Sequence, residues 1–213
     1  MQDFSSGLRE FLYRKLAPRP QPQEITLEQR NSIIIDDQRL YTAGTFSVNY
    51  TTYDCLRDRD VINPLHDRRN IMVHVPLQGD DDSTHPWRYR RVLKIFRAQV
   101  SLTRMLPAKW VEFVWVRWYR TDPSHAFGAG VLRLERVAYW PDDRPEGFGF
   151  VDLADIMRGI QVLPGTHHRI NTIHCGDVSI THDRPEGDFK YHYIGQCIQG
   201  NHTAHDLTSA QVL

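Results

Sequence analysis

Residues 110–120 carry bulky apolar side chains on both faces of a predicted strand, and this feature restricts the fold more than any other part of the chain. Alternate residues of a strand point to opposite sides of its sheet. Phe113 and Trp115 therefore share one side, and Val114 and Val116 share the other. A strand that needs cover on both sides belongs in the middle of a sheet or barrel, so we predict that it is the core strand.

Several other segments alternate apolar and polar residues in the manner of half-buried strands. They are residues 33–35, 45–50, 71–75, 87–100, 131–140, 160–163 and 189–198. Charged and turn-forming residues predict loops or connectors at residues 57–69, 79–86 and 141–149. The predicted fold class is therefore mainly β, with a small twisted barrel at its centre.

Helices are predicted at two places. Leu8 and Leu12 belong to an apolar series near the helical period, which predicts a short amphipathic helix over residues 4–16. A second short helix is predicted within residues 152–160, before the closing strand, with Asp152 near its N-cap.

We predict one main domain with two extensions. Residues 1–24 form the helix and a proline-rich linker, residues 25–165 form the barrel domain, and residues 166–213 form a histidine-rich C-terminal extension packed on the barrel. A chain of 213 residues, 40% of them apolar, can bury a core of this size. No apolar run approaches the roughly 20 residues that a membrane-spanning helix needs, so no membrane association is expected.

Charge and cysteine content narrow the classes of function. Lysine plus arginine and aspartate plus glutamate number 26 each, for a net charge of +0, which argues against a bulk electrostatic attraction to nucleic acid. Cys55, Cys175 and Cys197 form no CxxC pair, so neither a disulfide framework nor a zinc ribbon is indicated. We expect a reducing compartment.

The sequence lacks the short motifs of nucleotide binding, acyl transfer and zinc proteolysis, so we expect no enzymatic activity and no cofactor. The acidic runs 80–82 and 142–143 are interpreted as solvated loops rather than as a magnesium site. The histidines and cysteines after residue 166 lack the paired short spacings of structural zinc sites, so no metal is predicted.

The order of these motifs resembles the bromo-adjacent homology (BAH) domain of chromatin proteins. Such domains typically carry an aromatic-x-Arg-Val strand, a Val-Arg-Trp-Tyr strand, a strand ending in aromatics, and a short helix before a closing strand. The matching stretches are WRYRRVLKIF (87–96), VWVRWYR (114–120), RVAYW (136–140) and DLADIMRGIQVLP (152–164). The resemblance covers about residues 40–165. It implies a BAH-like twisted barrel that recognises another protein.

The chain also resembles uncharacterised proteins of mushroom-forming fungi that are often encoded in or beside DNA transposons. This resemblance rests on the blocks RDRDVINP (57–64), HPWRYRRV (85–92), FVWVRWY (113–119) and GFGFVD (147–152). It implies a nuclear, transposon-derived protein but no activity for this part of it.

BAH domains that read histone tails use an aromatic cage, in which ring faces attract the ammonium group of methyl-lysine. The resemblance implies that Trp118, Tyr139 and Trp140 form such a cage, with Tyr89 as a fourth wall. The alternative is that these rings fill the interior of the barrel.

A second candidate surface would contact nucleic acid. Arg88, Arg90 and Lys94 are expected to share one face of a strand, and aromatic residues lie between them. The alternative is an exposed barrel surface neutralised by the acidic loops.

We therefore expect a non-enzymatic, nuclear module for chromatin or protein interaction, with a histone-tail reader as its specific form. The expected partner is a protein or a histone peptide. The alternative function is a DNA-binding accessory region of a transposase.

Overall fold

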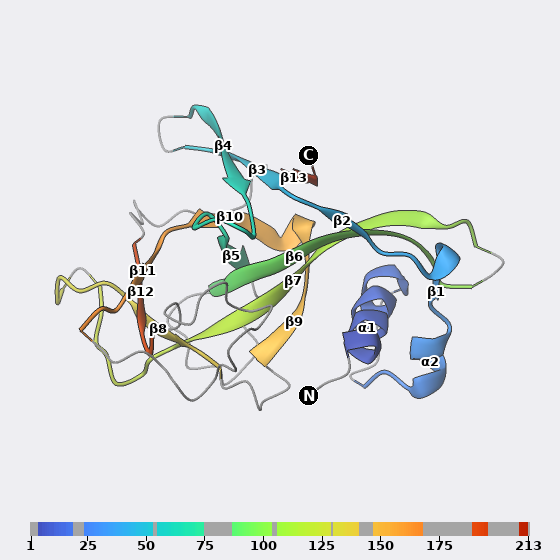
Figure 1. Ribbon diagram of the computed structural model, residues 1–213, viewed down its shortest axis with the longest axis horizontal. Coiled ribbons are helices and arrows are strands. Elements are labelled where there is room, and N and C mark those ends of the chain that lie inside the picture. Colours follow the sequence, from blue (N-terminus) through green and yellow to red (C-terminus); the bar gives the residue numbers. More distant parts are fainter. Residues whose placement is uncertain are drawn as a thin grey trace.

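The computed structural model describes residues 4–18, 24–52, 55–74, 87–103, 106–128, 130–140, 147–167, 189–195 and 209–212 of the chain. This part is mainly β, as predicted, and it includes a barrel-shaped sheet (Figure 1). Its α-helices are α1 (Phe4–Leu16) and α2 (Leu27–Asn31), and both precede the long strands. The predicted N-terminal helix is therefore confirmed, with the same bounds.

Seven antiparallel strands form the barrel in the order β10-β5-β6-β7-β8-β12-β11. They are β5 (Asn70–His74), β6 (Trp87–Ser101), β7 (Lys109–Thr121), β8 (Arg136–Tyr139), β10 (Ile156–Ile160), β11 (Val162–Pro164) and β12 (His192–Ile194). The two ends of this order, β10 and β11, are separated in the chain by Gln161 alone. The sheet therefore curls round until it is nearly closed.

Shorter strands extend this framework. The strands β1 (Ile34–Ile35) and β2 (Tyr41–Ala43) pair with β6, and β9 (Phe148–Asp152) pairs with β7. A separate three-stranded sheet contains β13 (Ser209–Val212), β3 (Phe46–Thr51) and β4 (Arg57–Ile62), and Figure 1 shows β3 and β4 projecting above the barrel. In the described part of the chain, the 3₁₀ turns Asp36–Gln38 and Leu153–Asp155 connect neighbouring elements.

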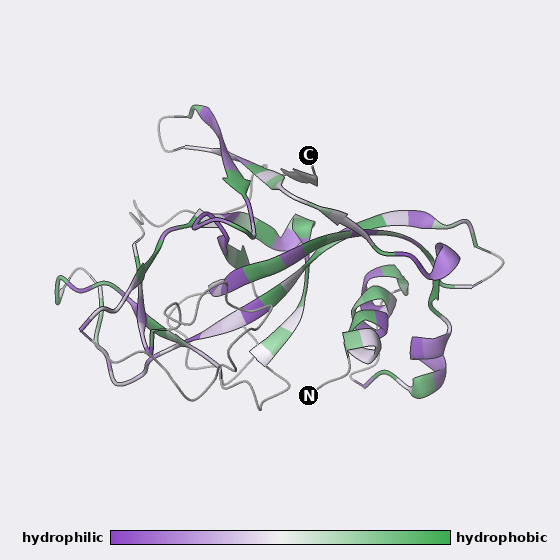
Figure 2. Ribbon diagram, in the orientation of Figure 1, coloured by the Kyte–Doolittle hydropathy of each residue, from purple (hydrophilic) through white to green (hydrophobic). Residues whose placement is uncertain are grey.

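The core strand β7 is covered on both sides, as its residue pattern predicts. On one side Val114 and Val116 pack in a cluster that includes Phe46 of β3. On the other side Phe113 packs in a cluster that includes Leu12 of α1. Hydrophobic residues recur along α1, β6 and β7 (Figure 2). The N-terminal helix is therefore what covers the second face of the central sheet.

Two expectations about strand positions were wrong. Residues 57–62 form β4 instead of a loop, because they pair with β3 and leave the charged side chains of residues 57–59 exposed. Residues 148–152 form β9 instead of the end of a connector, because they complete the sheet beside β7. In both places, pairing with a distant strand decided the conformation.

The second predicted helix is reduced to the 3₁₀ turn Leu153–Asp155. The cap is as expected, since the Asp152 carboxylate accepts a hydrogen bond from the Ala154 backbone N–H at 3.1 Å. After one turn, however, Ile156 enters β10 and pairs with Val73. The predicted strand at residues 131–140 is likewise shorter, because β8 covers Arg136–Tyr139 and pairs with β7 only over residues 137–139.

The C-terminal extension supplies strands to both sheets. Its described segments contribute β12, which pairs with β8 and β11, and β13, which pairs with β3. The acidic loop predicted at residues 79–86, the acidic pair 142–143 and most histidines of the extension lie outside the described residues.

Candidate functional site

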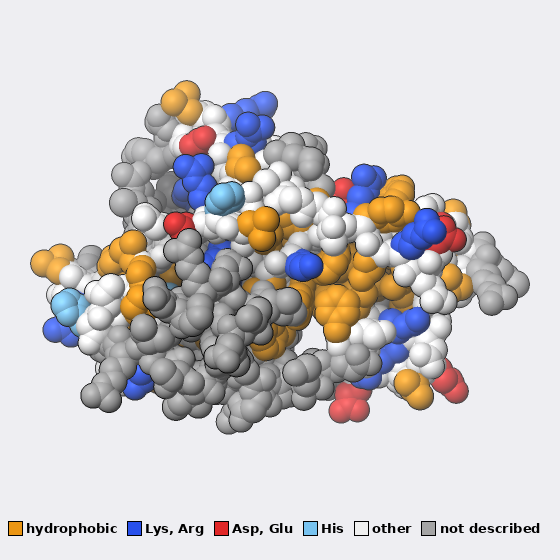
Figure 3. Space-filling model, in the orientation of Figure 1, with side chains coloured by type: hydrophobic (Ala, Val, Ile, Leu, Met, Phe, Trp, Pro, Cys, Tyr) orange, Lys and Arg blue, Asp and Glu red, His pale blue; other side chains and the backbone are white. Residues whose placement is uncertain are grey.

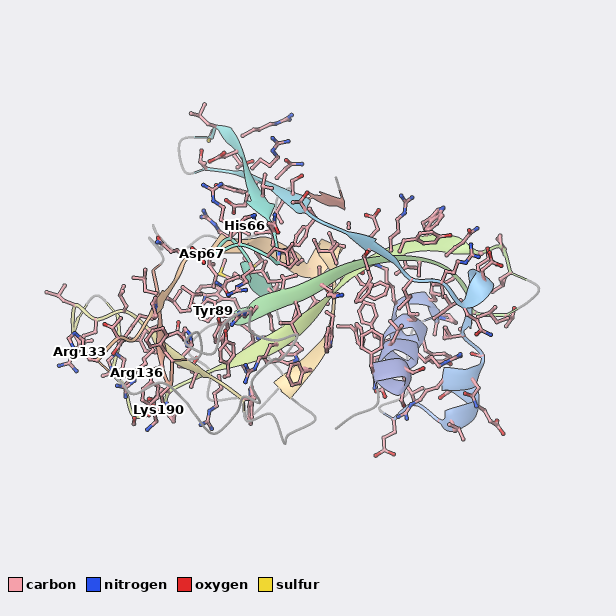
Figure 4. The ribbon with its side chains drawn as sticks, in the orientation of Figure 1. His66, Asp67, Tyr89, Arg133, Arg136 and Lys190 are labelled. Atoms are coloured by element: carbon pink, nitrogen blue, oxygen red, sulfur yellow. The ribbon has the colours of Figure 1, made fainter. Side chains whose placement is uncertain are left out.

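Three tyrosines from consecutive strands of the barrel meet in its interior. Tyr89 of β6, Tyr119 of β7 and Tyr139 of β8 are all buried, in a cluster that draws residues from β5, β10 and β12 as well. Tyr119 and Tyr139 are paired in register, and their rings stack with centroids 4.5 Å apart. His192 of β12 meets both rings edge-on. Figure 4 shows Tyr89 near the start of β6.

A chain of hydrogen bonds runs in one direction through Tyr139 and Tyr119. Arg91 Nη1 donates to the Tyr139 hydroxyl at 2.8 Å, and the Tyr119 hydroxyl donates to Asn70 Oδ1 at 3.1 Å. The two hydroxyls are 2.8 Å apart, so Tyr139 must donate to Tyr119. A buried polar chain of this kind is stabilising only when its members are satisfied. Because both tyrosine hydroxyls are satisfied within this chain, we interpret the barrel interior as a structural element.

Burial also determines the protonation state of two of the interior tyrosines. It raises the pKa of Tyr119 well above the usual tyrosine value, and the neighbouring Tyr139 raises it further. It raises the pKa of Tyr89 as well, with the nearby Glu135 carboxylate adding to the effect. The Tyr89 hydroxyl donates to Glu135 Oε2 at 2.8 Å. Both phenols are therefore neutral hydrogen-bond donors at physiological pH.

The opposite face of the barrel sheet holds a stacked pair, Arg90 and Trp118. The two residues are opposite each other in the β6–β7 register, and the Arg90 guanidinium carbon lies 3.2 Å from the centre of the Trp118 ring. Trp118 in turn lies against Gly149 of β9, where an added Cβ would be 2.7 Å from the indole Nε1. Arg90 is 3% exposed. Burial lowers the pKa of its guanidinium, and the charge of Arg88 lowers it further.

The structure divides the four rings of the predicted cage between different places. Tyr89 and Tyr139 point into the barrel, whereas Trp118 points to the other side of β7 because it is one residue from Tyr119. Trp140 is half-buried, and its ring centre is 5.8 Å from the Arg120 guanidinium. The described geometry therefore brings together Tyr89 and Tyr139 with the interior cluster, and it separates them from Trp118.

The expected stripe of Arg88, Arg90 and Lys94 is not on one face. A bulge at Leu93 shifts the register, so that Val92 opposes Val116 while Lys94 opposes Trp115. Lys94 consequently points to the side of α1, away from Arg90. Arg90 is also buried, so the phosphate backbone of a DNA or RNA strand cannot reach it. The extra residue of the bulge is the reason that simple alternation was wrong here.

An open aromatic surface was missed by the sequence-based reasoning. Tyr41 of β2 and Trp110 of β7 are each 49% exposed, and their ring centroids are 5.7 Å apart. Arg97 of β6 lies between these strands, with its guanidinium carbon 4.3 Å from the centre of the Trp110 ring. We call these three residues the Tyr41–Trp110 surface. Figure 3 shows hydrophobic side chains beside basic ones over β2 and the outer ends of β6 and β7.

One sequence signal does point to this surface. Trp110 has the same strand parity as Glu112, so the face that is apolar at Val114 becomes charged toward the start of β7. A tryptophan among charged residues at the end of a strand is expected to be partly exposed to solvent. Arg97 Nε is 3.6 Å from Glu112 Oε1, and both side chains are partly exposed.

In the described part of the chain, no group of three or more histidine, cysteine or acidic residues is placed to hold a metal ion. His192, one of the histidines considered and not predicted as zinc ligands, packs on the interior tyrosines, and the rest of that group after residue 167 lies outside the described residues. None of the helices that the structure describes is long and apolar enough to cross a membrane.

Comparisons of the chain with models of protein families, with curated proteins and with solved structures find no match. The resemblances to BAH domains and to the fungal transposon-associated proteins therefore stay predictions.

Proposed function

We propose that this chain is a non-enzymatic protein-interaction module that uses the Tyr41–Trp110 surface to hold an extended segment of a partner protein. The observation that carries the proposal is the pair of half-exposed rings with an arginine stacked on one of them. Tryptophan, tyrosine and arginine are the residues that most often dominate binding energy at protein interfaces.

The exposed rings offer enough area for binding. A tyrosine or tryptophan buries about 150–250 Å² when fully covered, so the exposed halves of Tyr41 and Trp110 leave about 200 Å² in total. At about 25 cal/mol per Å², covering this area yields on the order of 5 kcal/mol before the entropic cost of association. A contact of this size suits a short peptide segment.

Arg97 adds a polar anchor to the rings. Its stacking on Trp110 restricts the guanidinium before a partner arrives, which lowers the entropic cost of binding. Its ion pair with Glu112 is exposed and longer than a hydrogen bond, so it contributes little that a ligand would have to replace. A backbone carbonyl or carboxylate of the partner can then accept from the guanidinium.

The strand beside the rings provides a second means of attachment. Among the described strands, β2 pairs with β6 alone, so its other edge has no strand partner there. An extended peptide can pair with such an edge and place alternate side chains on the face that carries Tyr41. Main-chain pairing would supply affinity, and the aromatic surface would select the sequence.

The two resemblances suggest a setting for this activity. On the resemblance to transposon-associated fungal proteins we propose a nuclear protein of transposon origin, and on the resemblance to BAH domains we propose a histone tail as one candidate partner. Trp118 and Tyr139 already face the guanidinium groups of Arg90 and Arg117, at 3.2 and 4.0 Å from the ring centres. For this reason we place the contact at the Tyr41–Trp110 surface rather than in a methyl-lysine cage.

Selecting binders from a random peptide library on the immobilised chain tests the Tyr41–Trp110 surface without assuming which ligand it binds. We expect enriched peptides to bind the unaltered chain at least about tenfold more tightly than they bind Trp110→Ala. An aromatic side chain that becomes buried at a hot spot contributes roughly 1.4 kcal/mol or more to the binding free energy. Leu27→Ala removes another exposed apolar side chain, on α2, and is the matched control. Enriched peptides that bind Trp110→Ala and the unaltered chain equally would refute this surface.

Fluorescence anisotropy with histone-tail peptides, unmodified and lysine-trimethylated, tests the chromatin part of the proposal. Binding that requires Trp110 and survives Trp118→Ala supports it. Absence of binding across the peptide set removes the histone tail as the partner. A gel shift of duplex DNA that weakens steeply with salt, without peptide binding, would favour the alternative role as a DNA-binding accessory region of a transposase.

A further inference from the structure

Arg90 is a buried cation whose protein contacts leave part of its guanidinium unused. Its Nη1 donates to the Tyr89 backbone carbonyl at 2.7 Å, while its buried Nε has no hydrogen-bond partner. Among the described residues, no carboxylate forms an ion pair with it. A buried donor without an acceptor is unfavourable and calls for an explanation.

The position of Arg90 is fixed by its neighbours. The Trp118 ring lies 3.2 Å beneath the guanidinium, and the absence of a side chain at Gly149 lets that ring lie close against β9. Both Trp118 and Arg88 are half-buried, so they form the border between Arg90 and the surface. Arg88 is two residues away on the same strand face and adds a second positive charge nearby.

We propose that Arg90 and Trp118 form a binding site for a single oxyanion group, a phosphate or a carboxylate. The unused edge of the guanidinium supplies donors in a planar fork, which matches the oxygen spacing of both groups. Trp118 holds the guanidinium in place by stacking against one of its faces. Low solvent access strengthens these charge-assisted hydrogen bonds relative to exposed ones.

This inference is independent of the proposed function, because the pair lies on a different part of the sheet from Tyr41 and Trp110. The competing explanation is that stacking on Trp118 alone compensates for the burial of Arg90. The two explanations differ in one respect. Only a binding site responds specifically and saturably to an added oxyanion.

Thermal unfolding in inorganic phosphate, acetate or chloride at matched ionic strength distinguishes them. We expect phosphate or acetate, but not chloride, to raise the Tm of the unaltered chain to a plateau, because a ligand that binds only the folded state stabilises it. The stronger of the two identifies the group as phosphate or carboxylate. Arg90→Met should abolish the shift, while Arg120→Met, which removes an exposed arginine beside the Trp140 ring, should retain it.

A second measurement keeps the test decisive if Arg90→Met does not fold. The indole N–H resonance of Trp118, assigned by its loss in Trp118→Phe, should move with phosphate or acetate and reach saturation. Other indole signals should move much less. No saturable shift of this resonance, or equal stabilisation of the unaltered chain and Arg90→Met, would overturn the site and leave stacking as the full explanation.

Discussion

Gly149→Ala provides a direct test of the packing between β7 and β9. An ideal Cβ at this position would lie 2.7 Å from Trp118 Nε1, 2.9 Å from Cζ2 and 3.1 Å from Cε2. Unstrained contacts between such atoms are about 3.5–4.0 Å, so the ring must retreat by roughly 1 Å. Arg90 lies against the same ring, and Gly149 is held opposite Val116 by strand pairing. Moving either the Trp118 ring or the backbone of β9 would therefore cost free energy.

The expected change in the free energy of unfolding follows from two opposing effects. Overpacking of this kind destabilises by about 1–3 kcal/mol, while replacing glycine with alanine stabilises by about 0.4–1 kcal/mol through the unfolded chain. We therefore expect a net loss of about 1–2 kcal/mol in the free energy of unfolding, measured by urea denaturation. Gly44→Ala is the control, since its Cβ would meet nothing within 4 Å.

A double-mutant cycle shows whether Trp118 is the cause. In a Trp118→Ala background, Gly149→Ala should lose most of its effect, because the atoms that it strikes are gone. Two results would refute the reasoning. One is a Gly149→Ala chain as stable as Gly44→Ala, and the other is a destabilisation that is unchanged when Trp118 is absent.

Three further predictions follow from other parts of the fold. Tyr139→Phe removes the middle member of the interior hydrogen-bond chain and should cost about 1–3 kcal/mol in urea denaturation; no change would contradict the directional network. Leu12→Ala empties a fully buried position beneath α1 and should cost about 2–5 kcal/mol, whereas exposed Arg14→Ala should be near neutral. Burial, helped by the Asp58 hydrogen bond, raises the pKa of Tyr50 to about 12. Tyr50 therefore contributes stability below the unfolded value of 10.0, and that contribution is lost as pH rises to about 12. Urea midpoints should fall less over this range in Tyr50→Phe than in the unaltered chain, and parallel curves would contradict the shift.

Local patterns were sufficient for the elements that they contain entirely. The helix Phe4–Leu16 was predicted with its bounds because its apolar spacing is set by neighbouring turns of one helix. The strands β6 and β7 were predicted because their alternation extends over many residues. The need to cover both sides of β7 also followed from its own side chains, so its central place in the sheet was predictable.

Long-range pairing decided what local patterns could not. The charged segment Arg57–Ile62 is a strand only because β3 pairs with it, and Phe148–Asp152 is a strand only because β7 has room beside it. Alternation shows which residues share a side, but it does not show what covers that side. Trp118 and Trp110 have the same parity on β7, yet one packs against Gly149 and the other is half exposed.

The candidate sites show the same division. The sequence alone determined a β-rich chain with a two-sided core strand and many arginines among its aromatic residues. Only the tertiary structure decided which of those residues meet, because the bulge at Leu93 reverses the facing of the residues after it and the barrel encloses Tyr89 and Tyr139. A side chain's neighbours depend on the register between strands that are distant in the chain, and no local pattern records that register.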